Sequence, residues 1–108
     1  MKKKRIVSTL LALLLFAGLP VSALAAEWDI GKGDITVNAG SGGQTVTQGS
    51  QVDVPDSAPV ITGSSTGNTV TINAEKDQTA IVTLSGVNID VSSAGKAAVS
   101  TTGEGNVN

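Results

Sequence analysis

Residues 69–91 read TVTINAEKDQTAIVTLSGVNIDV, and apolar and polar side chains alternate twice in this stretch, at 70–73 (VTIN) and at 87–90 (VNID). Because successive side chains of a β-strand point to opposite faces, each alternation predicts a short strand with one buried and one exposed face. The side chains expected to point inward are Val70, Ile72, Val82, Leu84, Val87, Ile89, Val91 and Val99.

The same apolar–polar quartet recurs along the chain. Copies start at Ile35, Val52, Val70 and Val87, and another opens at Val107. Weaker strands are expected between these copies, at 45–47, 60–62, 80–84 and 97–99. Short strands that recur with polar corners are typical of a β-solenoid, in which each coil buries its apolar face against its neighbours.

A β-sandwich is the alternative architecture, because hairpins of an immunoglobulin-like sandwich fragment also recur at this kind of spacing. The two architectures differ in one pairing. In a solenoid, the strands at 70–72 and 87–89 run parallel or follow one another around a coil. In a sandwich, they pair antiparallel through a tight turn. Very short strands and repeated Thr and Asn positions favour the solenoid.

The composition after residue 25 supports an all-β chain. It holds eleven Val, six Ile and eleven Thr against a single Leu, Leu84. β-Branched side chains are stiff at χ1 and fit a pleated, half-buried surface, whereas a helical domain would use Leu, Glu, Lys and Ala freely. Gly, Ser, Asn and Asp supply the turns between strands.

The first 25 residues have the pattern of a secretory signal peptide. Lys2 to Arg5 form a basic start, an apolar run follows to Leu19, and Ala23-Leu24-Ala25 supplies a small-x-small exit. The apolar run is shorter than the roughly 20 residues of a membrane span. We therefore expect cleavage after Ala25, a secreted, extracellular protein and no transmembrane segment in the mature chain.

The charge of the mature chain limits its chemistry. Beyond residue 25 there are three Lys and nine Asp or Glu, a net charge of −6, and no Cys, His or Arg. This composition excludes a His-dependent catalytic triad and a Cys- or His-based zinc site. A strongly acidic surface without Arg also argues against nucleic acid or anionic lipid as a partner.

The second half of the chain resembles a known family. The residues that carry the resemblance are Val60-Ile-Thr-Gly63, Thr69-Val-Thr-Ile-Asn73 and the run from Ala80 to Asp90, with 97–99 and 105–108 continuing the series. This series is similar to the secreted carbohydrate-binding, right-handed parallel β-helix proteins of clostridia and related gut bacteria. The resemblance implies a right-handed parallel β-helix that binds cellulose-like or acidic sugars, with calcium in some members. The chain shows no ligand motif of the family, so no binding residue is transferred.

The resemblance and the strand pattern together predict three segments. Residues 1–25 are the signal peptide, 26–58 form lead-in or cap strands, and 59–108 form the first coils of a parallel β-helix carbohydrate-binding domain. Because Asn108 falls inside a strand pattern, we expect only the N-terminal coils of a longer protein, whose remainder would carry any cell-surface attachment.

Candidate binding residues follow from side-chain chemistry. Trp28 is the one aromatic of the mature chain and would stack on a sugar or plug the end of the first coil. Asn88 and Asp90 share the outward face of one predicted strand, and with Asn73 and Asn106 they would line a polar groove that recognises hydroxyl groups. The alternative is a solvated face that keeps the sheet soluble.

A calcium ion is compatible with the acidic residues, although no cofactor is required. Asp29 and Asp34 flank Gly31-Lys-Gly33, and Asn88 with Asp90 offers a second oxygen pair. Calcium binds six or more oxygen ligands, so neither pair completes a site alone. Turn formation is the alternative role for Asp29 and Asp34.

The predicted function is a secreted or cell-surface, non-catalytic polysaccharide-binding module. The alternatives are a structural or adhesin stalk and the N-terminal part of a polysaccharide lyase or glycoside hydrolase. Asp53 and Asp90 are the best-placed carboxylates for hydrolysis, but nothing marks either as an acid held neutral by burial. A lyase would need a cationic base, usually Arg, which the mature chain lacks.

Overall fold

The computed structural model describes residues 26–108, and the predicted signal peptide lies outside these residues. In the described part the chain forms short strands and two single-turn 3₁₀ helices, η2 (Ile30–Lys32) and η3 (Ser92–Ala94). The strands are β1 (Glu27–Asp29), β2 (Ile35–Gly40), β3 (Gly43–Gln48), β4 (Gln51–Pro55), β5 (Val60–Thr62), β6 (Ser64–Ser65), β7 (Val70–Ala74), β8 (Thr79–Ala80), β9 (Thr83–Leu84), β10 (Asn88–Ile89), β11 (Val99–Thr102) and β12 (Asn106–Val107). The predicted all-β class is confirmed.

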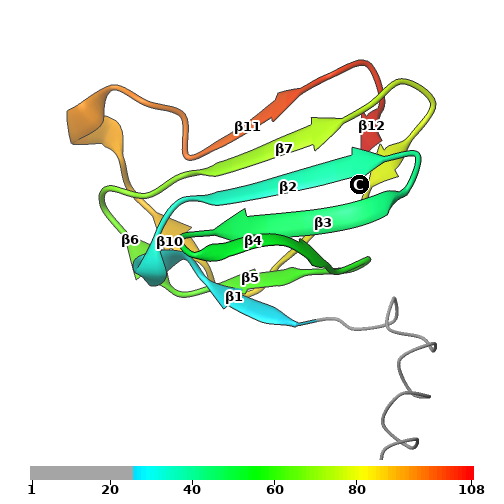
Figure 1. The fold of residues 1–108 in the computed structure, drawn as a ribbon. Helices are drawn as coiled ribbons and strands as arrows, with labels where there is room; N and C mark the ends of the chain where they lie inside the picture. Colours follow the sequence, from blue (N-terminus) through cyan, green and yellow to red (C-terminus); the bar gives the residue numbers. More distant parts are fainter. Residues whose placement is uncertain (1–25) are drawn as a thin grey trace, which may run out of the picture.

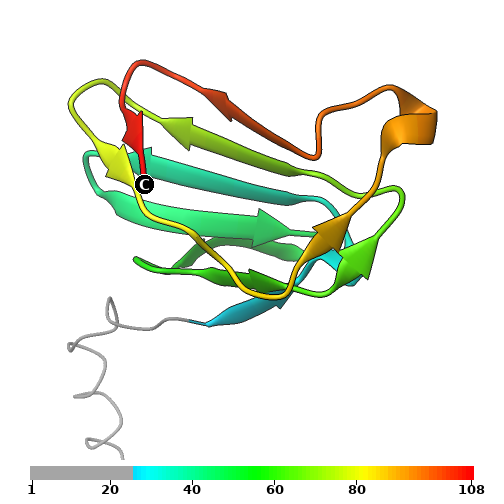
Figure 2. The ribbon, with the colours of Figure 1, turned by 180° about the vertical axis from the view of Figure 1, so that it is seen from behind.

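The strands form four sheets. The largest has the order β11-β7-β2-β3-β4, and the others are β1-β5-β9, β10-β6 and β12-β8. Figure 1 shows the five-stranded sheet as a stack, with β6 and β10 at one end and β12 at the other. Figure 2 shows the molecule from behind, where the yellow to orange segment that contains β9 and β10 runs in front of the large sheet.

The chain visits the four sheets twice in the same order. Residues 60–80 form β5, β6, β7 and β8, and residues 83–107 form β9, β10, β11 and β12. Each strand of the second round pairs in parallel with its counterpart in the first. Strands β1 and β2 extend two of these ladders, pairing in parallel with β5 and β7.

The two predicted architectures differ in how the strands at 70–74 and 88–89 are paired, and these two strands do not pair with each other. The strands at 70–74 and 88–89 lie in different sheets, each paired in parallel, and so follow one another along the chain. The quartets do not pair with their nearest copies. Val70 pairs with Ile35, two copies upstream. The copy at 52 lies in the same sheet but pairs with β3, and the copy at 87 lies in a different sheet.

An antiparallel hairpin, β3–β4, continues the large sheet beyond β2. The side chain of Gln48, only 7% exposed, donates to the carbonyl oxygens of Asp29 (2.8 Å) and Gly33 (2.9 Å). The amide of Gln44 donates to the carbonyl oxygen of Ile81 and accepts from its N–H, both at 2.9 Å. These amides fix the hairpin to the rest of the molecule by satisfying backbone groups that a strand would otherwise pair.

The core consists of columns of apolar side chains across the parallel ladders. Trp28, Ile61 and Leu84 are paired in register, as are Ile35, Val70 and Val99. Residues paired in a parallel ladder point to the same face, so each column lines one face of its sheet from strand to strand. Fully buried apolar side chains include Ile30, Ile35, Val37, Val46, Ile61 and Val70.

The burial expected from the sequence is correct for part of the inward set. Val70, Ile72 and Val91 are buried, and Val82, Val87 and Ile89 pack partly buried against the core. Leu84 and Val99 correct the expectation, since they are 49% and 36% exposed. They belong to the same columns as Ile61 and Val70, but β9 and β11 are the outermost strands of their sheets within the described residues.

Candidate functional site

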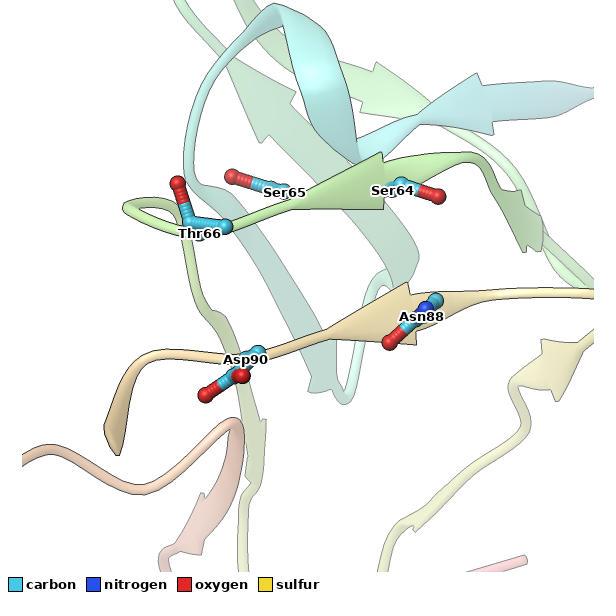
Figure 3. A pocket seen from close by; sticks show the side chains of 5 residues that line it. All are labelled: Ser64, Ser65, Thr66, Asn88 and Asp90. Atoms are coloured by element: carbon cyan, nitrogen blue, oxygen red, sulfur yellow. The ribbon is translucent and has the colours of Figure 1, made fainter. Parts of the chain in front are cut away.

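A shallow polar recess of about 440 Å³ lies over the β6–β10 ladder. It is lined by Ser64, Ser65, Thr66, Asn88 and Asp90, whose side chains are drawn in Figure 3. Asn88 and Asp90 are two of the residues that the sequence predicts to bind carbohydrate. The structure therefore brings two predicted residues together with three hydroxyl side chains.

The register of the ladder explains why these side chains meet. Ser64 pairs with Asn88. The N–H of Asp90 donates to the carbonyl oxygen of Ser65 at 2.9 Å, so Thr66 and Asp90 are the next residues of the same register. Alternate residues share a face about 7 Å apart, and neighbouring strands lie about 4.8 Å apart. Ser64, Thr66, Asn88 and Asp90 are exposed, whereas Ser65 and Ile89 are half-buried. The four exposed side chains form a two-by-two array.

The turn that ends β6 is held by the strand itself. The hydroxyl oxygen of Ser65 accepts from the N–H groups of Gly67 (3.1 Å) and Asn68 (2.8 Å). The amide of Asn68 donates to the carbonyl oxygen of Ile30 in η2 at 2.9 Å. The hydroxyl of Ser65 is therefore engaged in the turn, and the array of four carries the hydrogen-bonding capacity of the recess.

Hydrogen bonds from Ser92 favour the charged form of Asp90. The pKa of its carboxyl group lies below its usual value because Ser92 donates two hydrogen bonds to Oδ1, from Oγ at 2.6 Å and from the backbone N–H at 3.1 Å. Hydrogen bonds to the charged form favour ionisation. Because both bonds end on Oδ1, the second oxygen is the one that a ligand hydroxyl or a cation would meet.

Asn73 belongs to a different surface. It lies on β7, where its amide donates to Oδ1 of Asn38 (3.2 Å) and its Oδ1 accepts from the hydroxyl of Thr102 (2.9 Å). These three residues are paired in register across β2, β7 and β11. Asn106 lies on β12, paired with Thr79 of β8. Neither Asn73 nor Asn106 lines the recess, so the predicted groove is divided among three sheets.

Trp28 is buried within β1. Only 5% of its surface is exposed, and its indole N–H donates to Oδ2 of Asp56 at 2.9 Å. A sugar ring stacks on an exposed aromatic face, so Trp28 is not part of the recess and contributes to the core instead.

Asp29 and Asp34, the predicted calcium ligands, each accept a backbone hydrogen bond. Asp29 caps η2 by accepting from the N–H of Gly31 at 2.8 Å, and Asp34 accepts from the N–H of Thr69 at 2.8 Å. Within residues 26–108, no three His, Cys, Asp or Glu side chains lie together as metal ligands would. Calcium at Asn88 and Asp90 therefore stays a prediction that needs oxygens from a ligand or water.

Sequence reasoning missed Ser64, Ser65 and Thr66, because residues 63–67 have the composition of a turn. The signal that locates them is the pairing of successive rounds, which sets Ser64 beside Asn88. Asp53, the other carboxylate considered for hydrolysis, lies on β4 of the large sheet and does not line this recess.

Comparison with known proteins gives no relative: no protein family, curated protein or solved structure matches the chain. In the part of the chain that the structure describes, no helix has the length and apolar character needed to cross a lipid bilayer. The function is therefore argued from the recess and the strand arrangement.

Proposed function

We propose that the chain is a secreted, non-catalytic polysaccharide-binding protein with a right-handed parallel β-helix fold. Two rounds of strands that visit four sheets in the same order support the fold. The parallel pairing of every second-round strand supports it further, because stacked coils of a solenoid pair in this way. The resemblance of residues 60–108 to carbohydrate-binding β-helices agrees with this fold.

The observation that carries the function is the array of Ser64, Thr66, Asn88 and Asp90 in one recess. Hydroxyl, amide and carboxylate groups supply both donors and acceptors, which suits the hydroxyl groups of a sugar. The recess is shallow and follows a sheet surface, so it suits a side-on contact with a long glycan. Binding at such an exposed surface is weak for each sugar unit and gains strength from repetition along a polymer.

Charge selects among glycans. Asp90 is ionised, and the mature chain has a net charge of −6, so a neutral, cellulose-like glucan fits the recess better than an acidic one. A galacturonan would place carboxylate against carboxylate, which is unfavourable at short range without a bridging cation. Calcium held between Asp90, Asn88 and the sugar acids would serve as that bridge.

The test is affinity electrophoresis of the protein in gels that contain a soluble cellulose derivative or polygalacturonate. We expect retardation by the glucan in chelator and retardation by the galacturonan only with calcium. Asn88→Ala together with Asp90→Ala should lower the apparent affinity by about tenfold or more, since each lost hydrogen bond contributes about 0.5–1.5 kcal/mol.

Asn106→Ala is the matched control, because it removes the same amide from an exposed position on another sheet. Equal loss in the control and the recess variant, or no retardation in any gel, would contradict the proposed site. Release of reducing or unsaturated ends during incubation with the polysaccharide would favour the enzyme alternative.

A structural stalk is the second candidate. Leu84, Val99 and Val107 are exposed large apolar residues on β9, β11 and β12, the outermost strands of three sheets within the described residues. Apolar side chains at such edges suit the stacking of further coils, which a stalk and a binding module share. The electrophoresis separates the two, because a stalk alone retains no glycan.

A further inference from the structure

Asp56 is a buried carboxylate that the recess does not use. It lies between β4 and β5 with 1% of its surface exposed. Its Oδ2 accepts from the indole N–H of Trp28 (2.9 Å) and from the backbone N–H of Ala26 (3.2 Å), and its Oδ1 accepts from the N–H of Ala58 (3.1 Å). These three donors are uncharged. A buried carboxylate is unfavourable unless a positive charge or strong hydrogen bonds compensate it.

Ala26 is also the first residue after the predicted cleavage site. In the uncleaved chain its nitrogen is an amide that carries one hydrogen and no charge. Hydrolysis of the Ala25–Ala26 bond by a peptidase breaks the C–N bond and adds water, so that Ala25 ends in a carboxylate and the nitrogen of Ala26 becomes an α-ammonium group. The atom that gains the positive charge is the atom that already contacts Asp56.

We infer that Asp56 is the receptor for the mature N-terminus: removal of residues 1–25 converts a neutral hydrogen bond into an ion pair between the α-ammonium of Ala26 and the buried Asp56 carboxylate. Hydrogen bonds between two charged groups are about twice as strong as neutral ones. The mature chain is therefore more stable than the precursor.

The structure fixes the position of the Ala26 nitrogen. The carbonyl oxygen of Ala26 accepts from the N–H of Val60 at 3.0 Å, and β1 begins at the next residue. Trp28, two residues on, anchors the strand in the core and bonds the same carboxylate. Ala26 itself is exposed, which leaves room for the upstream chain and for a peptidase before cleavage. Cleavage one residue later would remove the nitrogen that contacts Asp56.

Other charged groups also lie near Ala26. Glu27 follows it in the chain, and Asp29 and Lys32 line a shallow recess of about 280 Å³ together with Ala26 and Trp28. Asp56 is distinguished from them by its burial and by its direct hydrogen bond to the nitrogen.

The first experiment exports the full-length precursor from a bacterial host and measures the intact mass and the α-amine pKa of the secreted protein. The expected mass starts at Ala26. The pKa of its α-amine, followed by ¹⁵N NMR, should lie about one unit above the ordinary value of about 8, because a neighbouring carboxylate favours the charged form. A start at another residue, or an α-amine with an ordinary pKa, overturns the inference.

The second experiment isolates the charge by inserting Gly-Ser between Ala25 and Ala26. This variant keeps the Ala26 N–H at Asp56 but moves the ammonium group away. We expect its unfolding equilibrium at pH 7, followed by fluorescence of Trp28, to favour the unfolded state about tenfold more than in the native form. A group with a raised folded pKa stabilises below its unfolded pKa, so the difference is present below about pH 8 and disappears as the pH rises through the folded pKa.

Asp56→Asn should return the α-amine to an ordinary pKa, whereas Asp77→Asn, an exposed carboxylate, should leave it raised. If Asp56→Asn does not fold, the insertion variant decides the question. Identical pH profiles for the native and inserted chains would refute the ion pair. None of these outcomes depends on glycan binding.

Discussion

Replacing Gly63 with Ala should destabilise the fold at the corner that positions the recess. Gly63 has φ of +88°, a conformation that residues with a side chain rarely adopt, and a Cβ at this position would overlap Oδ1 of Asp29. The strained backbone costs about 1–3 kcal/mol. Displacing the Asp29 side chain also breaks its bond to the N–H of Gly31, and loss of such a cap costs about 1 kcal/mol. We expect a loss of about 2–4 kcal/mol in the free energy of unfolding.

Urea unfolding followed by fluorescence of Trp28, the single Trp of the chain, measures this loss. Gly49→Ala is the matched control: Gly49 has φ of +61°, but nothing lies within 4 Å of the place that its Cβ would take, so only about 1 kcal/mol of backbone strain is expected. In the Asp29→Ala background, Gly63→Ala should cost only its backbone strain, about 1–3 kcal/mol, because the contact with the carboxylate is gone. Equal losses for Gly63→Ala and Gly49→Ala in the native background would refute the role of the contact with Asp29.

Two further predictions concern the core and the recess. Ile61→Ala should lower the free energy of unfolding by about 2–5 kcal/mol because Ile61 is fully buried. Leu84→Ala in the same column should lower it by about 1 kcal/mol or less because Leu84 is 49% exposed. Equal losses for the two variants in urea unfolding would contradict the difference in burial between these residues. Ser92→Ala should raise the pKa of Asp90 toward its usual value, since it removes the stronger of two hydrogen bonds that favour the charged form. An NMR titration of the Asp90 carboxyl carbon measures this pKa. An unchanged midpoint would show that the Ser92 hydroxyl does not lower the pKa of Asp90.

The positions of many strands could be predicted from the sequence, but β1, β6 and the partners of the strands could not. Period-2 alternation located β2, β7 and β10, because the alternation of faces is a local property of a strand. Pairing is not local. The repeated quartets suggest that one copy stacks on the next, yet Val70 pairs with Ile35 and Val99, and the copy at 87 lies in another sheet.

In the column of Val70, burial depends on the number of strands paired beside a residue. Val70 has paired strands on both sides and is fully buried, whereas Val99 in the same column is partly exposed. The apolar character of a residue specifies the face to which it points, and its exposure depends on how many strands cover that face. Trp28 is different, because β1 is also an outermost strand of its sheet and yet Trp28 is buried. The segment that follows β4 contacts it there, with Asp56 accepting from its indole N–H, and its own neighbours in the sequence do not reveal this contact.

In-register pairing also explains why the polar columns of this fold differ in their capacity to bind. In the column of Asn38, Asn73 and Thr102, the side chains bond one another, so much of their hydrogen-bonding capacity is used within the protein. In the column of Ser64 and Asn88, a short hydroxyl faces an amide across a shallow recess, and the next pair sets Thr66 beside an ionised Asp90. A ligand gains most from polar groups that are held in place yet not satisfied by one another, because it then replaces only water. By this reasoning the β6–β10 face, and not the longer row of amides on the large sheet, is the surface on which a sugar should bind.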